Sequence, residues 1–160
     1  MITVLKNWLM TRARKRPCTT IVLHGTAGAS AESSVSWLRQ IGLSYHYIVD
    51  RDGSVIKCAP TSRVAFHAGK SVGPQGENVN DYSIGIAFAN LEDGRDKITL
   101  AQLDAVASLV KQLEPEFPLK WVTTHYAISP RRKTDPVMLK AVDLIAFVAR
   151  VNLTAWLGAK

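Results

Sequence analysis

The sequence has few cysteines and no long apolar run. Its 160 residues include only Cys18 and Cys58, and the interval between them matches no zinc or redox motif. A chain of this length can bury a core without disulfides, so we expect two free, buried thiols in a protein made in a reducing compartment. No window reaches about 18 uncharged apolar residues, and no membrane-spanning helix is expected.

The first residues do not resemble a secretory signal. Lys6 and Asn7 interrupt their apolar residues, and the basic residues at 12–16 follow the apolar ones, whereas a secretory signal places basic residues first. We therefore expect a protein made in the cytoplasm without a Sec signal.

Acidic residues are fewer than basic ones. The 13 Asp and Glu residues stand against 20 Lys and Arg residues, which gives a net charge of +7. Such a charge suits an anionic partner: nucleic acid, an anionic membrane surface or a cell-wall polymer. The basic residues cluster at 12–16 and 131–133 without the stacking aromatic residues of a nucleic-acid-binding module, so no nucleic acid is expected. Peripheral contact with an anionic cell envelope is the simpler interpretation.

The order of the predicted elements indicates one α/β (α+β) domain over residues 1–160. The segments predicted as strands are 19–24, the hairpin 45–60 with its turn at Asp52-Gly53, 82–90 and 120–125. The predicted helices are a basic N-terminal helix over 1–17, one from Ser30 to Gly42, one capped by Thr99 and Gln102, and one from Asp135 to about Arg150. Strands and helices alternate except at the hairpin, which predicts a central mixed β-sheet flanked by helices.

Two of the predicted strands end on a histidine, His24 and His125, and Asp135 follows in a loop. Ligand sites of open α/β sheets gather at strand ends. Two imidazoles and a carboxylate form a three-ligand zinc set that leaves the fourth position to water, and zinc lowers the pKa of such a water to about 7, which suits amide hydrolysis. The alternatives are hydrogen-bonded structural histidines and an Asp135 that caps the last helix.

Five motifs carry a family resemblance. In order, "IVLHGTAG", "YHYIVDRDGSV", "AFHAG", "NDYSIGIAF" and "THYAISPRRKTDP" resemble the motifs of the zinc-dependent N-acetylmuramoyl-L-alanine amidases. This amidase-2 group includes phage amidase lysozymes and peptidoglycan-recognition proteins. The resemblance spans residues 19–137 and implies a family-like core over about 19–150. It also implies a mixed sheet flanked by helices, with one Zn²⁺ in a surface groove held by His24, His125 and Asp135.

The resemblance also implies two catalytic residues. Lys133 matches a lysine that stabilises the oxyanion in the family; the alternative is a lysine that only extends a basic run into solvent. Many members carry a glutamate where this chain has Ala87, so the obvious general base is missing. Tyr45 matches a tyrosine near the zinc water in the lysozyme-like phage branch, where a nearby zinc ion lowers its pKa or the phenol orients the water. The alternative for Tyr45 is an ordinary aromatic residue of an amphipathic strand.

The remaining histidines are expected to differ in role. His67 matches a groove-lining histidine, which implies a substrate contact, with support of a metal ligand as the alternative. Asn80 belongs to the family's Asn-x-x-Ser-Ile-Gly signature and is expected to brace the substrate groove, one wall of which is the loop 70–80. His46 should point away from Tyr45 because side chains alternate along a strand, so we expect it to be packed.

The resemblance implies a peptidoglycan hydrolase that cuts the amide between N-acetylmuramic acid and L-alanine of the stem peptide. We expect it to be a monomer. Our main interpretation is a phage endolysin that reaches the wall through a holin during host lysis. The alternatives are a cytoplasmic muropeptide-recycling amidase and a non-catalytic peptidoglycan-binding module. Binding modules of this kind typically lose a metal ligand, whereas all three matching positions are kept here.

Overall fold

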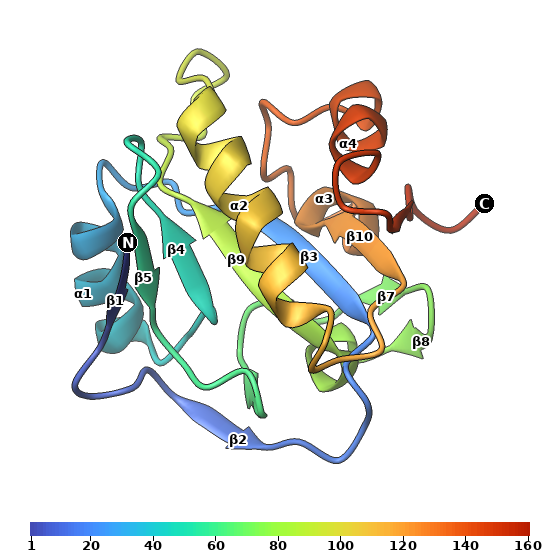
Figure 1. Ribbon diagram of the computed structural model, residues 1–160, viewed down its shortest axis with the longest axis horizontal. Coiled ribbons are helices and arrows are strands. Elements are labelled where there is room, and N and C mark those ends of the chain that lie inside the picture. The colour runs from blue at the N-terminus through green and yellow to red at the C-terminus, as the bar shows by residue number, and fades with distance from the viewer.

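The computed structural model describes all residues, 1–160, and is built around a seven-stranded mixed sheet (Figure 1). The strand order is β1-β5-β4-β9-β3-β10-β11, and every neighbouring pair is parallel except β4 with β5. The strands are β1 (Ile2–Val4), β3 (Thr20–Gly25), β4 (Tyr47–Val49), β5 (Val55–Lys57), β9 (Ser83–Phe88), β10 (Trp121–Thr124) and β11 (Thr154–Ala155). Two short antiparallel pairs lie apart from it: β2 (Thr11–Ala13) with β6 (Arg63–Ala65), and β7 (Val72–Gly73) with β8 (Gly76–Glu77). The predicted mixed sheet is confirmed.

Helices flank the sheet, and local capping explains where two of them begin. The helices are α1 (Ala31–Ile41), α2 (Leu100–Leu113), α3 (His125–Ile128), α4 (Ala141–Val148) and the 3₁₀ turn η1 (Val79–Tyr82). Ser30 caps α1, and Gly42 ends it with a φ of 69°, a left-handed conformation that favours glycine. Thr99 and Gln102 form the predicted capping box of α2. No helix combines the length and the apolar character needed to cross a membrane.

The two central strands, β3 and β9, are buried along their whole length. Ile21 and Leu23 of β3 belong to the larger apolar core, which is covered by α2 and α4; Figure 1 shows α2 lying across this face. Val22 belongs to a separate cluster on the opposite face, with residues of η1 and α3. Because side chains alternate along a strand, His24 lies on the same face as Val22. The sheet therefore turns His24 away from the larger core.

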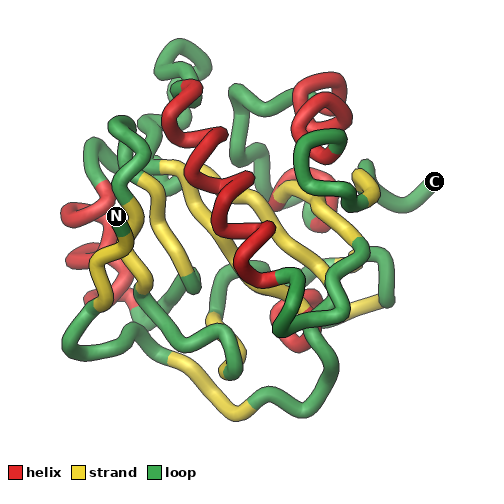
Figure 2. Tube along the Cα trace, in the orientation of Figure 1, coloured by secondary structure: helices red, strands yellow, loops and turns green.

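The predicted N-terminal helix over residues 1–17 is wrong. β1 pairs with β5, β2 pairs with β6, and no helix precedes α1 (Figure 2). The amides of Leu5 and Leu9 continue this pairing, donating to the carbonyls of Lys57 at 3.1 Å and Cys58 at 2.9 Å. The edge of the β4–β5 hairpin thus supplies the backbone partners that a helix would have supplied. Such long-range pairing leaves no trace in the local pattern of apolar residues.

The basic cluster in this segment is used to hold the fold together. Arg14 donates hydrogen bonds to four backbone carbonyls, those of Thr61, Arg63, Asp81 and Ser83. Arg12 forms an ion pair with Asp81, and the guanidinium carbon of Arg16 lies 4.4 Å from the ring centre of Tyr82. The cluster therefore joins the N-terminal segment to η1 and β6.

The last helix begins later than predicted. α4 starts at Ala141, where the Lys140 amide donates a 2.9 Å hydrogen bond to the Asp143 carboxylate. Asp135 does not cap this helix, so the structural alternative for this residue is wrong. Both cysteines are free and buried, as expected.

Candidate active site

The three predicted metal ligands lie together at one end of the sheet. β3 and β10 are parallel neighbours, so His24 near the end of β3 and His125, directly after β10, reach the same edge. Their Nδ1 atoms are 3.1 Å apart. Asp135 completes the group, with Oδ1 3.1 Å from Nδ1 of His125 and Oδ2 3.4 Å from Nδ1 of His24. All three donor atoms lie within 4.8 Å of one another.

The hydrogen bonds around His125 show that this group suits a cation. Nε2 of His125 lies 3.2 Å from the carbonyl oxygen of Ala68. A carbonyl only accepts, so Nε2 carries the proton, and Nδ1 of the neutral ring presents a lone pair to Asp135. Lone pairs that converge on one point need a cation between them. Two imidazoles and one carboxylate are a donor set that Zn²⁺ takes at catalytic sites, so these residues fit zinc.

The surroundings favour the ligand forms that bind metal. Burial, together with the neighbouring His125, lowers the pKa of His24 to about 4, so its ring is neutral near pH 7. Burial alone would raise the pKa of Asp135, but the neighbouring imidazoles of His125 and His24 hold it well below its usual range. The amide of Gly25 donates to Oδ2 of Asp135 at 3.2 Å and helps to orient the carboxylate.

A cavity of about 330 Å³ opens on this group. Its walls include Tyr45, His67, Glu92, Lys133 and Asp135. An adjoining cavity of about 380 Å³ shares His67, His125 and Lys133 with it and extends to Asn80. The metal ligands therefore face an open groove rather than a closed structural site, which leaves room for a substrate.

Both predicted catalytic residues lie at this groove. The ring centre of Tyr45 is 4.9 Å from that of His24. Burial, with the nearby charges of Asp135 and Glu92, raises the pKa of Tyr45, so the phenol keeps its proton near neutral pH. Lys133 lines both cavities and makes no ion pair with any carboxylate of the chain. Their catalytic roles stay predictions.

His67 and Asn80 lie behind the ligands. The side-chain oxygen of Asn80 accepts hydrogen bonds from the amides of His67 at 3.1 Å and Ala68 at 2.8 Å, so Asn80 holds the backbone of this groove segment, and its part in binding substrate stays a prediction. The ring of His67 is buried and lies 2.9 Å from Nε2 of His24. These contacts fit the alternative role in supporting a ligand; a contact between His67 and substrate stays a prediction.

The fourth histidine of the chain, His46, is packed as expected. Its Nε2 lies 2.9 Å from the carbonyl of Arg63, and its Nδ1 accepts a 3.0 Å hydrogen bond from the amide of Gly85. Both ring nitrogens are therefore satisfied by backbone groups, and no atom of the ring is left for the groove.

Glu92 is a groove residue that the sequence reading missed. One carboxylate oxygen accepts a 2.7 Å hydrogen bond from the amide of Val137, and the other is buried without a hydrogen-bond partner, close to Gly25. Burial is the main cause that raises the pKa of Glu92 to about 7. Glu92 follows β9 in a polar loop that leaves the same edge of the sheet as His24. This position could have identified it as a candidate.

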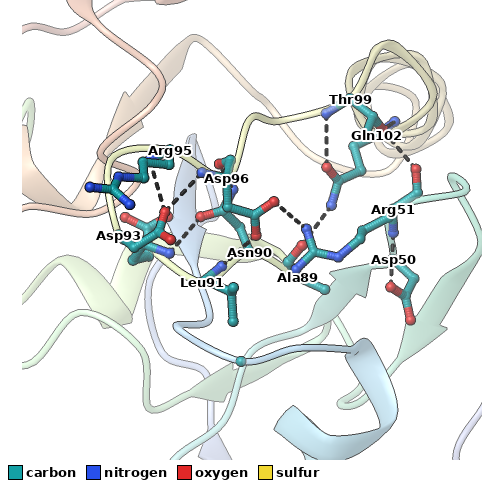
Figure 3. A network of polar contacts seen from close by, with 12 residues as sticks. Asp50, Arg51, Ala89, Asn90, Leu91, Asp93, Arg95, Asp96, Thr99 and Gln102 are labelled. Atoms are coloured by element: carbon teal, nitrogen blue, oxygen red, sulfur yellow. Dashed lines mark hydrogen bonds and ion pairs between the residues drawn. The ribbon is translucent and has the colours of Figure 1, made fainter.

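A polar network holds the loop that carries Glu92 (Figure 3). The Asp96 carboxylate forms an ion pair with Arg51 at 2.6 Å and accepts a 2.8 Å hydrogen bond from the amide of Leu91. The Gln102 side chain, at the start of α2, donates to the carbonyl of Ala89 at 3.1 Å. The loop is thus fixed to both the β4–β5 hairpin and α2, which places this wall of the groove.

Comparison with known proteins gives one family. The family profile described as N-acetylmuramoyl-L-alanine amidase matches residues 14–137. The chain is 33% identical over 116 residues to the 1,6-anhydro-N-acetylmuramyl-L-alanine amidase AmpD of Citrobacter freundii, a match that covers 70% of this chain and 60% of that protein. It is also 33% identical over 135 residues to AmpD of Salmonella typhimurium, covering 82% of this chain and 69% of that protein. The chain thus spans about 60–70% of the length of these relatives.

Solved structures share the fold. AmiD of Escherichia coli, solved in complex with anhydro-N-acetylmuramic acid-L-Ala-D-γ-Glu-L-Lys, is 25% identical with a TM-score of 0.76, and the match covers 90% of this chain and 60% of that one. The amidase LysC of Clostridium intestinale is 19% identical with a TM-score of 0.75, covering 96% and 99% of the two chains. The predicted amidase fold is confirmed.

Proposed function

Because this chain belongs to the N-acetylmuramoyl-L-alanine amidase family, we propose that it hydrolyses the amide bond between N-acetylmuramic acid and L-alanine of a peptidoglycan stem peptide. The observation that carries this proposal is the convergence of His24, His125 and Asp135 within 4.8 Å at the mouth of an open groove. The ligand set is complete, which argues against a binding module without catalysis.

The groove residues suit the chemistry of amide hydrolysis. His24, His125 and Asp135 would hold a zinc ion, which supplies a Lewis acid and lowers the pKa of a water molecule. Tyr45 offers a phenol proton that orients the attacking water by a hydrogen bond. Lys133 places a positive charge, unpaired within the protein, where negative charge develops on the substrate oxygen.

We further propose that the substrate is a soluble 1,6-anhydro-muropeptide. The curated relatives that are 31–34% identical to this chain are named for that substrate. The phage endolysin role predicted from the sequence gains no support from these relatives. A solved endolysin of Clostridium intestinale resembles this chain only in fold, at 19% identity. The recycling alternative is therefore the better supported of the two, and it replaces the endolysin as our main interpretation.

Mass spectrometry of the products tests both parts of the proposal. Zinc-loaded protein is incubated with anhydro-muropeptide and, separately, with intact sacculi. We expect release of free stem peptide, with faster turnover of the soluble substrate. Faster release from sacculi would restore the endolysin interpretation. Binding of muropeptide without any cleavage would instead identify a binding module.

A further inference from the structure

His67 stands at the centre of a chain of hydrogen bonds that ends at a metal ligand. Its Nδ1 lies 2.9 Å from Nε2 of His24, and its Nε2 lies 3.1 Å from the hydroxyl oxygen of Ser83. The Ser83 hydroxyl in turn lies 2.7 Å from the carbonyl oxygen of Val79. His24, His67 and Ser83 are all buried, so no solvent competes for these bonds.

The Val79 carbonyl, at the end of this series of hydrogen bonds, fixes the direction of each of them. The Val79 carbonyl only accepts, so the single hydroxyl proton of Ser83 is donated to it. The Ser83 oxygen must then accept from Nε2–H of His67. Nδ1 of the neutral His67 ring is consequently an acceptor, and it receives Nε2–H of His24. His24 is left with a lone pair on Nδ1, the atom that faces His125 and Asp135.

Gly85 makes room for this arrangement. A Cβ atom added to Gly85 would lie 2.6 Å from the ring carbon Cγ of His67 and 2.8 Å from Nδ1. Real Cβ atoms do not approach so closely, so any other residue in this position of β9 would displace the imidazole. Gly85 has no positive φ, which means that the close approach of His67, and not a backbone conformation, requires glycine here.

We propose that His67 is a positioning residue of the metal site: by accepting a hydrogen bond from Nε2 of His24, it holds the Nδ1 lone pair of His24 toward the metal. Ser83 and Gly85 belong to the same arrangement. Ser83 fixes the direction of the hydrogen bond between His24 and His67, and Gly85 leaves room for the His67 ring. The inference rests on the proposed metal site and assigns to His67 a role apart from substrate contact. Outer partners that orient a ligating histidine typically contribute about 10- to 100-fold to metal affinity.

Zinc affinity, measured by competition with a chelator, tests this role without any assay of turnover. His67→Leu removes the acceptor, and we expect its Kd for zinc to rise about 10- to 100-fold. His67→Asn keeps an acceptor oxygen near the place of Nδ1, and we expect it to recover most of the lost affinity. The control is Cys58→Ala, a change at a buried side chain in a separate apolar cluster that contains none of the three ligands, and it should leave the Kd unchanged.

Nitrogen-15 NMR of the unaltered zinc-loaded protein supplies a second readout that does not depend on a variant's folding. We expect His67 to carry its proton on Nε2 and His24 to carry its proton on Nε2. A proton on Nδ1 of His67, or a folded His67→Leu protein with the zinc affinity of the unaltered chain, would overturn the inference and leave the amidase proposal standing. An unaltered chain that binds no zinc would overturn both.

Discussion

The two sides of the candidate site are built in different ways. One side, here called the sheet side, consists of His24, His67, Ser83 and Gly85: its residues lie on the central strands or against them, are buried, and have partners for their polar side-chain atoms. The other, the loop side, consists of Tyr45, Glu92 and Lys133, which line the groove.

The polar ends of the loop side are less fully satisfied. The Tyr45 hydroxyl and the Lys133 ammonium form no hydrogen bond or ion pair within the protein, and one oxygen of Glu92 is unpartnered. Unsatisfied polar groups facing a groove are available to a ligand, whereas satisfied buried groups hold a geometry. The difference teaches that the sheet side should set metal affinity and the loop side should set the rate of the reaction.

The largest effect on the site is expected from His125→Ala, because both sides depend on the metal ion that this ligand would hold. We expect zinc content to fall to background and hydrolysis to be lost, because two remaining donors do not hold zinc in a catalytic site. Elemental analysis of the dialysed protein, together with a circular dichroism spectrum that verifies folding, measures this. Stoichiometric zinc in the variant would contradict the assigned ligand set.

Lys133→Ala should separate the loop side from the sheet side. Loss of a charge that stabilises an oxyanion costs about 10²- to 10³-fold in kcat, while zinc content should stay at one ion per chain. Steady-state kinetics with anhydro-muropeptide and metal analysis give the two readouts. The control is Lys111→Ala on the exposed surface of α2, which should change neither.

Tyr45→Phe removes one hydroxyl from the loop side and keeps the ring against His24. We expect kcat to fall by about 10- to 100-fold, less than for Lys133→Ala, because a hydrogen bond that orients water is lost while the charge stabilisation remains. The Kd for zinc should not change. A variant with full activity would show that Tyr45 is only a packing residue, the alternative that the sequence left open.

The smallest expected effect concerns pH and His46, which packs against the sheet side at Gly85. Burial lowers the pKa of His46 to about 3 in the folded protein, below the unfolded value of about 6.5. The folded state therefore resists protonation, so stability is greatest above about pH 6.5 and falls as the pH is lowered toward 3. Between pH 6.5 and 5, His46 alone should cost about 2 kcal/mol of unfolding free energy.

Urea unfolding of the zinc-free protein at both pH values measures this loss. His46→Gln has no ring to protonate and should show a pH-dependent loss smaller by about that amount. Equal pH dependence in the two proteins would mean that the ring of His46 accepts a proton in the folded state.

Local signals in the sequence predicted much of the fold. The caps at Ser30 and Thr99 and the apolar run of β9 act within a few residues, so α1, α2 and the central strand could be located from the pattern alone. The N-terminal helix was wrong because the segment pairs with β5 and β6, far along the chain. The local spacing of apolar residues does not indicate that a segment pairs with a strand far along the chain.

The candidate site divides in the same way. His24, His125 and Asp135 could be predicted because they belong to motifs with a family resemblance, and the structure brings them together. The contacts of His67 with His24 and of Glu92 with Val137 could not, because each joins two segments that are far apart along the chain. A three-dimensional arrangement was needed to see what those side chains touch.

The arginine cluster near the N-terminus has a consequence for how this protein meets polyanions. Arg12, Arg14 and Arg16 are occupied by a carboxylate, by backbone carbonyls and by an aromatic ring of the same chain. These guanidinium groups keep their charge and stay part of the net +7, but their hydrogen-bonding capacity is partly used within the chain. The three arginines join segments of the same chain. Lys133, which lines both cavities of the groove and has no ion-pair partner, places a positive charge beside the metal ligands, where it would attract an anionic ligand.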